Sequence, residues 1–481
     1  MRNERRVLRN AGLLTLGEAA GQLANLLFVV SFARTYGVAA LGQYSLGMAT
    51  GAVAGLAVSF GTQNFLLREL SQHPALTARR IATLAPWHVA AAALIAALTS
   101  LVLAGREAGT LVLLVAVGYQ LVYRAGGLYY VAFRAAERMI VPVAADLGQR
   151  ALTLLLGGAL MFAGATATVT ACAMLVSATM FATLGRHLMQ REFGRLERVP
   201  AREVLQILRA SWPFFGTLAL GVLYARGAPI LLGLIRGAES VGGYAAADRL
   251  LVVATLIPAM YASAAIPALS RIAQHELEAL RALATRLLRI LLLVALTTAG
   301  LIAAFAQDLV HLLFGPQYAH AAVLLQILAI AIPVQATEQL LAALLSAVGL
   351  QHLLLRTRLA SLLAFAVAGS VAVYQWGAAG LAASVVGCSV LQLGGCIFHL
   401  ARRRELPLAP LAVFAPALSA GLAAATALLL AGQALLLRAF CFGVVLLVAG
   451  MASGAVRVHD FSFARALLRR EPAVRDSDRE A

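Results

Sequence analysis

Long apolar stretches separated by short polar segments run along the whole chain. Each stretch is about 20 residues long, which is the length a helix needs to cross roughly 30 Å of hydrocarbon at 1.5 Å per residue. The chain is 61% hydrophobic and 12% charged, whereas a soluble domain is about 45–50% apolar and about 25% charged. A soluble core cannot absorb that excess, so the pattern predicts transmembrane helices from end to end.

Turn residues and charges divide the sequence into about fourteen spans, with twelve as the alternative count. The first span is interrupted by Glu18, Gln22 and Asn25 and continues to Arg34. We therefore interpret it as a retained helix rather than a cleaved secretory signal. The fourteen spans begin near Ala11, Leu41, Ile81, Leu111, Pro142, Thr166, Ser211, Tyr244, Leu287, Ala319, Leu359, Gly380, Leu411 and Leu435.

The basic residues sort by loop. All 38 are arginine, and the net charge is +17. With the amino terminus in the cytoplasm, about thirty arginines fall on the cytoplasmic side, and this bias predicts the orientation of a membrane protein. Both termini are then cytoplasmic. The few arginines on the other side are Arg34, Arg106, Arg236 and Arg438. Basic residues that bind nucleic acid would instead cluster with aromatic residues on one face, so no nucleic-acid partner is expected.

The sequence contains no pattern typical of catalysis or metal binding. The four cysteines lie in apolar runs without the C-x-x-C or Cys/His spacing of a metal site. The nine histidines are scattered, and neither paired carboxylates nor a nucleophile motif appears. We therefore expect no enzyme, no catalytic residue, no metal and no cofactor.

Two similar segments suggest an internal repeat. Arg34-Thr35-Tyr36-Gly37 leads to Gly42-Gln43-Tyr44-Ser45, and Arg236-Gly237 leads to Gly242-Gly243-Tyr244-Ala245. Chance similarity in a sequence rich in Gly and Ala is the alternative explanation. A repeat of six helices keeps its orientation, so the two halves would be related by an axis along the membrane normal, with a cavity between two six-helix bundles.

The chain resembles the oligosaccharide flippases (Wzx type) of the polysaccharide-transporter branch of the MOP exporter superfamily. The resemblance covers most of the chain and rests on three sets of motifs in order. The first set is Phe32-Ala33-Arg34-Thr35-Tyr36-Gly37, Gly42-Gln43-Tyr44, Phe60-Gly61 and Leu67-Arg68-Glu69. The second set is residues 241–250, Ile257-Pro258 and residues 266–271, and the third is residues 313–318 and 321–325.

This resemblance implies an all-α polytopic protein with two six-helix bundles plus two C-terminal helices. We expect the bundles at residues 1–205 and 206–405, the additional helices at 406–456 and a cytoplasmic tail at 457–481. It also implies a flippase of the bacterial inner membrane that moves a polyprenyl-diphosphate-linked oligosaccharide to the periplasmic leaflet by alternating access. Such a flippase serves the biosynthesis of surface polysaccharide, such as the O-antigen of lipopolysaccharide or exopolysaccharide. The partners it implies are the lipid-linked substrate, membrane lipids and a polysaccharide polymerase with its chain-length machinery.

Charged side chains within the spans are the best candidates for a binding site, because they usually face protein or water. Arg124 and Arg226 each lie about ten residues, or roughly 15 Å, from the end of their spans. Two such arginines suggest a cationic cavity that binds the diphosphate of the lipid carrier, and an internal ion pair is the alternative. Arg34, Arg68 and Arg249 are weaker candidates for the same cavity.

Other charges have different expected roles. Asp146 and Arg150 stand four residues apart on one helix face, which favours a structural ion pair. Glu18 and Glu338 lie at depths where a carboxyl is often held neutral, so either could carry a coupling proton or simply accept a hydrogen bond. The family often places an acidic residue after the arginine equivalent to Arg226, whereas this chain continues with Gly227-Ala228-Pro229.

Three alternative functions remain open. A peptidoglycan lipid precursor flippase or a multidrug exporter of the same superfamily would have a similar number of spans, but arginines in the spans favour an anionic lipid-linked substrate over a cationic drug. A membrane polysaccharide polymerase or ligase would be expected to have a large extracytoplasmic loop, which the sequence lacks. A non-transporting scaffold for a biosynthetic complex is the third alternative.

Overall fold

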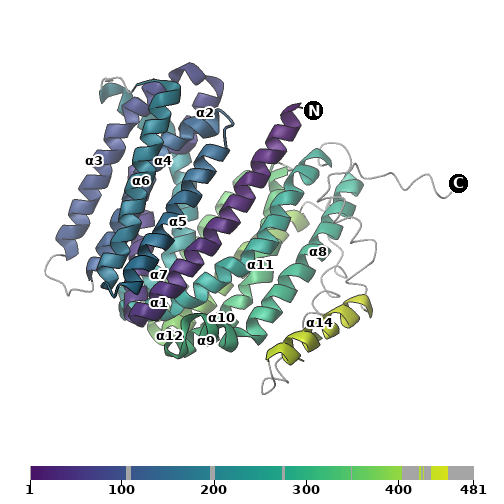
Figure 1. The fold of residues 1–481 in the computed structure, drawn as a ribbon. Helices are drawn as coiled ribbons and strands as arrows, with labels where there is room; N and C mark the ends of the chain where they lie inside the picture. The colour runs from purple at the N-terminus through teal and green to yellow at the C-terminus, as the bar shows by residue number, and fades with distance from the viewer. Residues whose placement is uncertain are drawn as a thin grey trace. The chain divides into compact units, whose positions relative to one another are not determined.

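The computed structural model describes residues 2–103, 110–195, 201–272, 277–347, 349–402, 422–423, 426 and 435–452. Within these ranges every regular element is a helix (Figure 1). The first half contains α1 (Arg2–Ser59), α2 (Thr62–Gln72), η1 (Pro74–Leu76), α3 (Thr77–Leu103), α4 (Thr110–Ala135), α5 (Ile140–Phe162) and α6 (Ala167–Phe193). The second contains α7 (Ala201–Ile272), α8 (Leu277–Ala304), α9 (Ala306–Phe314), η2 (Pro316–Tyr318), α10 (Ala319–Ala329), α11 (Ala331–Ala347), α12 (Gln351–Arg402) and α14 (Leu435–Ala452).

Nine helical segments in the described part are long and apolar enough to cross a membrane. Three of them, within α1, α7 and α12, are 44, 61 and 51 residues long, which is at least twice the length that one crossing requires. Each of the three is broken once at a glycine, so the nine segments provide twelve crossings. The chain is therefore an all-α multi-pass membrane protein. The predicted span near Leu411 lies outside the described residues, and α14 begins at the start predicted for the last span.

Glycines make the three breaks. Gly37, Gly237 and Gly377 have φ angles of 81°, 81° and 58°, in the left-handed region that side chains with a Cβ rarely adopt. The helix α7 also contains Pro213, Pro229, Pro258 and Pro267, yet Gly237 is where its backbone leaves helical geometry. Proline removes one hydrogen bond of a helix, which neighbouring groups in a membrane can replace, whereas a turn between two crossings requires a reversal of the chain.

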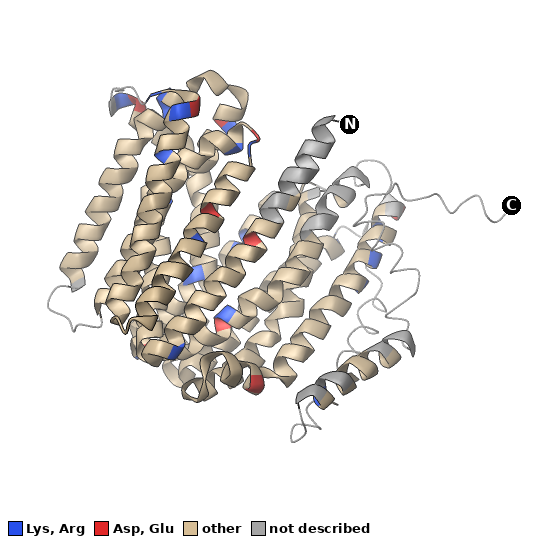
Figure 2. Cartoon of the chain, viewed as in Figure 1, with Lys and Arg blue, Asp and Glu red and all other residues tan. Residues whose placement is uncertain are grey.

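The described helices form two compact units. The first comprises residues 1–253, 310–324 and 362–385. Within it, α4 packs against both α1 and α6. Its core includes the aromatic residues Tyr130, Phe133 and Phe181, and the rings of Tyr130 and Phe181 stack with centroids 4.4 Å apart. Many charges of this unit lie near the ends of α2, α3 and α6, others lie along the middle of the helices, and most of the helix length is uncharged (Figure 2).

The two segments of the suspected repeat pack against each other inside this unit. A Cβ atom added to Gly42 would lie 1.8 Å from the carbonyl oxygen of Ala238, and one added to Gly242 would lie 2.0 Å from that of Val38. Each glycine therefore faces the carbonyl four residues before the other glycine. Such a reciprocal pattern is the mark of a two-fold relation. The predicted similarity thus corresponds to a symmetric crossing of α1 and α7, where backbone touches backbone.

The second unit comprises residues 254–309, 325–361 and 386–481. Arg438 of α14 is buried there, and it joins this helix to the α8–α9 junction. Its Nη1 lies 2.7 Å from Oδ2 of Asp308, and its Nη2 donates to the carbonyl of Ala304 at 2.6 Å. The guanidinium carbon also lies 4.8 Å from the centre of the Phe305 ring. One side chain thus combines an ion pair, a helix-end hydrogen bond and a cation–π contact.

We expect Arg438→Ala to lower the free energy of unfolding by about 2 kcal/mol. Breaking a buried ion pair costs about 3–5 kcal/mol, and partial exposure of Asp308 to solvent reduces that value. Thermal unfolding of the purified chain in detergent, followed by tryptophan fluorescence, measures the change. Arg356→Ala, at an exposed position of α12 in the same unit, serves as the control. Equal unfolding temperatures for the two variants would contradict the anchoring role of Arg438.

Candidate functional site

A cavity of about 370 Å³ lies inside the first unit. Its walls come from α1, α4, α5, α6 and the two parts of α7, and all of the lining residues lie between Gln22 and Val252. The helix α4 supplies Tyr119, Gln120, Tyr123 and Arg124, which recur with a spacing of three to four residues. That spacing places them on one helix face, so a polar stripe on an otherwise apolar helix forms one side of the cavity.

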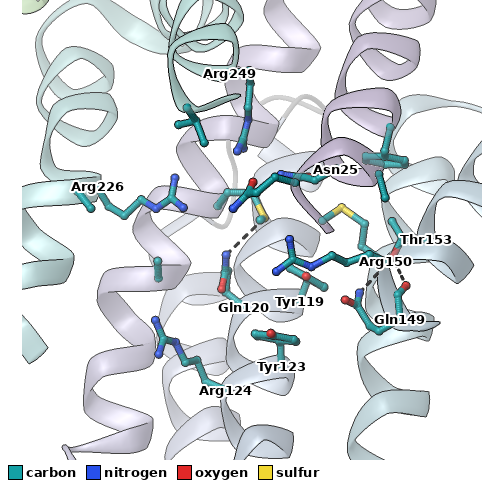
Figure 3. A pocket seen from close by; sticks show the side chains of 18 of the residues that line it. Asn25, Tyr119, Gln120, Tyr123, Arg124, Gln149, Arg150, Thr153, Arg226 and Arg249 are labelled. Atoms are coloured by element: carbon teal, nitrogen blue, oxygen red, sulfur yellow. Dashed lines mark hydrogen bonds between the residues drawn. The ribbon is translucent and has the colours of Figure 1, made fainter. Parts of the chain in front are cut away.

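Four arginines line this cavity and point into it from different sides (Figure 3). Arg124 comes from α4, Arg150 from α5, and Arg226 and Arg249 from α7. Arg249 is 8% exposed. Arg226 also lies within electrostatic range of both Arg249 and Arg124. Like charges so close together repel one another, and the arrangement is therefore typical of a site that receives an anion.

Carboxylates balance part of this charge. The Oδ2 atom of Asp146 lies 2.9 Å from Nε of Arg150, and its Oδ1 accepts a hydrogen bond of 2.6 Å from the hydroxyl of Tyr123. A second carboxylate, Glu18, has Oε2 3.8 Å from Arg150. Asp248 lies within electrostatic range of Arg226 and Arg249. Within the described residues, Arg124, Arg226 and Arg249 form no salt bridge at 4 Å or less, so the cavity keeps a positive charge.

The structure brings together three of the five arginines proposed for a cationic cavity. Arg124, Arg226 and Arg249 line it, whereas Arg34 and Arg68 do not. Arg34 instead donates from Nε to the carbonyl of Leu313 at 2.7 Å and from Nη2 to that of Leu312. These carbonyls belong to the C-terminal end of α9, where helices lack acceptor partners. Arg68 is exposed on α2.

The two candidate coupling carboxylates have different surroundings. The side chain of Glu18 is 54% exposed, and its Oε1 accepts a hydrogen bond of 2.7 Å from the amide of Gln22. Glu338 lies in the second unit, where it is 8% exposed and its Oε1 is 3.3 Å from Nη2 of Arg358. The predicted partners Asp146 and Arg150 form their ion pair, and Arg150 also lines the cavity, a role that the sequence interpretation did not assign.

Uncharged polar residues of the cavity were missed by sequence reasoning. Asn25, Gln120, Gln149 and Thr153 all line it. A usable signal was present in the spacing. Gln120 stands four residues before Arg124, and Gln149 and Thr153 follow Asp146 at helical intervals, so each amide shares a helix face with a charged residue. Amides within apolar spans are less conspicuous than charges, so the sequence pattern pointed to the arginines.

A family model described as "Polysaccharide biosynthesis protein" matches residues 7–273. The chain belongs to this family. The Wzx-type resemblance suggested by the motifs is thereby confirmed, and the family is one of transporters rather than enzymes. The match includes every residue that lines the cavity. No curated protein sequence matches the chain.

Solved structures of the MOP superfamily share the fold of this family member. The lipid II flippase MurJ in an inward closed conformation has a TM-score of 0.73 at 10% identity, over 96% of this chain and 100% of that one. An inward-facing multidrug resistance MATE transporter of the MOP superfamily gives 0.64 at 15% identity, over 80% and 94%. A MOP superfamily transporter from Pyrococcus furiosus gives 0.55 at 16%, over 83% and 95%. These likenesses establish a fold of twelve or more helices.

Proposed function

We propose that this member of the polysaccharide biosynthesis family flips a polyprenyl-diphosphate-linked oligosaccharide from the cytoplasmic to the periplasmic leaflet by alternating access. The observation that carries the proposal is the cavity into which Arg124, Arg150, Arg226 and Arg249 point. A diphosphate that links a lipid to a sugar carries two negative charges, and planar guanidinium groups match phosphate oxygens with paired hydrogen bonds. Translocation needs no covalent step, which agrees with the absence of catalytic motifs in the sequence.

The direction of transport follows from the proposed orientation. Arginines are concentrated in the loops assigned to the cytoplasm, which places both termini there. The lipid-linked sugar would therefore bind from the side where it is made. The chemistry of this cavity can hold an anion in a membrane, where an unpaired phosphate is strongly unfavourable. We further propose that transport is driven by coupling to an ion, with Glu18 and Glu338 as the candidate residues that carry it.

A peptidoglycan precursor flippase is the second candidate, and the likeness in fold to the lipid II flippase MurJ favours it. Both substrates would present a diphosphate to the arginines, so the two candidates differ in the sugar. A multidrug exporter is less well supported, because four arginines in one cavity repel a cationic drug. The cavity chemistry thus separates the anionic substrates from the cationic ones.

The decisive experiment follows the lipid-linked intermediate in a strain that lacks this protein. We expect that intermediate to accumulate on the cytoplasmic face and surface polysaccharide to be lost, with both restored by the wild-type chain. Loss of viability with accumulated peptidoglycan precursor would instead support the second candidate. If the intermediate crosses normally and polymer length or linkage changes, the protein acts as a polymerase or as a scaffold for one, and the transport proposal is wrong.

A further inference from the structure

The cavity has two chemically different sides. Arg226 and Arg124 lie at one side, and Asn25, Gln149 and Thr153 lie at the other (Figure 3). We call the latter three residues the amide wall. They come from α1 and α5, and Gln120 of α4 lies between the two sides. A diphosphate held by the arginines would therefore have the amide wall within the same enclosed space.

Gln149 of the amide wall has an unsatisfied hydrogen-bonding atom. This side chain is 5% exposed, and its Nε2 donates to the hydroxyls of Thr153 at 3.1 Å and Ser177 at 2.9 Å. Its Oε1 atom has no hydrogen-bond partner within the described residues. Reversing the amide leaves an N–H group unsatisfied in its place. Buried amides are almost always fully bonded. The Oε1 atom is covered by its neighbours, but the residue lines the cavity, so an unpartnered atom there points to a ligand that it meets when the amide rotates.

Gln120 is bonded almost as poorly. The acceptor that its Nε2 contacts is the sulfur of Met48 at 3.7 Å, and a thioether is a weak acceptor. Beside it, the rings of Tyr119 and Tyr123 stack with centroids 5.9 Å apart, and both residues line the cavity. Two amides with spare capacity thus lie next to an aromatic surface, a combination suited to a molecule that has both hydroxyl groups and C–H faces.

The amide side carries little net charge. Arg150 is the arginine nearest to Gln149 in sequence, and its charge is offset by Asp146 at 2.9 Å and approached by Glu18 at 3.8 Å. Arg124, Arg226 and Arg249 form no salt bridge within the described residues, which leaves them available to the diphosphate. An acidic group on the ligand would meet at the amide wall only Arg150, which is already paired with Asp146, while a hydroxyl can donate to an amide oxygen and accept from an amide nitrogen.

We propose that the amide wall binds the sugar directly attached to the diphosphate, that this sugar is uncharged, and that Gln149 selects it by hydrogen bonding to a sugar hydroxyl or acetamido group. This inference rests on the proposed function, because the arginines place the diphosphate. Gln149 is then a specificity-determining residue. Its removal should affect the contribution of the sugar to binding and not that of the diphosphate.

The test compares lipid probes on the full chain in lipid nanodiscs by calorimetry. The probes are farnesyl diphosphate and the same lipid carrying N-acetylglucosamine, galactose or glucuronic acid on its distal phosphate. We expect at least one neutral sugar to tighten binding roughly tenfold over the bare diphosphate, as one or two hydrogen bonds allow. Glucuronic acid should give no gain, and a gain confined to that probe would overturn the assignment to an uncharged sugar.

Variants then locate the effect. Gln149→Leu should abolish the gain from the neutral sugar and leave affinity for farnesyl diphosphate within about twofold of wild type. Gln120→Leu, at a less buried site, should halve the gain or more and guards against misfolding of the first variant. Ser177→Ala is the matched control, because it removes a hydrogen-bond partner of Gln149 that does not line the cavity, and it should keep the gain.

The outcomes separate this inference from the function on which it rests. If wild type binds all probes equally, or if Gln149→Leu and Gln120→Leu both keep the gain, the amide wall does not read the sugar, although the flippase proposal stands. If wild type binds no probe, including farnesyl diphosphate, both the inference and the proposed cationic site are overturned.

Discussion

Replacing Arg124 and Arg226 together with alanine should reduce export of surface polysaccharide at least about 100-fold. Each guanidinium is expected to contribute about 1.5–3 kcal/mol through charge-assisted hydrogen bonds, and a loss of about 3 kcal/mol corresponds to roughly a 150-fold change in binding. The measurement is surface polysaccharide per cell together with the lipid-linked intermediate retained on the cytoplasmic face. Neither arginine forms a salt bridge within the described residues, so the variant should still reach the membrane in normal amounts.

Arg134→Ala provides the matched control for this experiment. Arg134 lies on α4, in the same helix as Arg124, but it is exposed in the last turn. We expect that variant to export normally. A folded double variant of Arg124 and Arg226 with unchanged export would rule out the cationic cavity as the substrate site and leave the family membership intact.

Gly42→Ala should strongly lower the free energy of unfolding of this protein. The new Cβ would lie 1.8 Å from the carbonyl oxygen of Ala238, and two backbones would have to separate because no flexible side chain can move aside. Overpacking a tight interface costs about 1–3 kcal/mol, occasionally more, and backbone contact places this site at the upper end, at about 3 kcal/mol. Thermal unfolding in detergent and the amount of protein in the membrane both report the loss.

The chain offers an unusually close control for that substitution. Gly243 is adjacent to Gly242 on the same turn of α7, and a Cβ added there would have nothing within 4 Å. Gly243→Ala should leave stability unchanged or raise it by up to about 1 kcal/mol, since alanine favours the helix. Gly242→Ala should behave like Gly42→Ala, because its Cβ would meet Val38. Similar unfolding temperatures for all three variants would contradict the symmetric crossing.

The glycine motifs show how far a sequence pattern can be interpreted. Gly37 and Gly237 were noted as parts of a repeat, and the structure places both at φ 81°, where they end one crossing and begin the next. The sequence spacing could not reveal that Gly42 faces the carbonyl of Ala238, nor that Gly242 faces the carbonyl of Val38. Such a contact depends on the angle at which α1 and α7 cross, and side-chain packing along both helices sets that angle.

The arginines show the same difference between what the sequence predicts and what only the tertiary structure reveals. Their depth in the spans could be counted along the chain, because helix rise is constant, and Arg124 and Arg226 were singled out on that ground. Arg34 and Arg249 were both weaker candidates, yet Arg249 lines the cavity, whereas Arg34 donates to the carbonyls at the end of α9. The partner of a long flexible side chain is chosen by whatever lies within its reach in space.

By itself, the sequence determined that this protein is an all-α multi-pass membrane protein of the polysaccharide biosynthesis family, where most of its helices begin, and which charges lie deep in the spans. Those features follow from hydrophobic length, helix geometry and local motifs, which are properties of neighbouring residues. The tertiary structure alone decided that Arg124, Arg226 and Arg249 share one cavity with Gln149, while Arg34 and Arg68 lie outside it. These four cavity residues lie up to 125 positions apart, and they meet because α4, α5 and α7 line the same cavity, which no pattern within a single helix records.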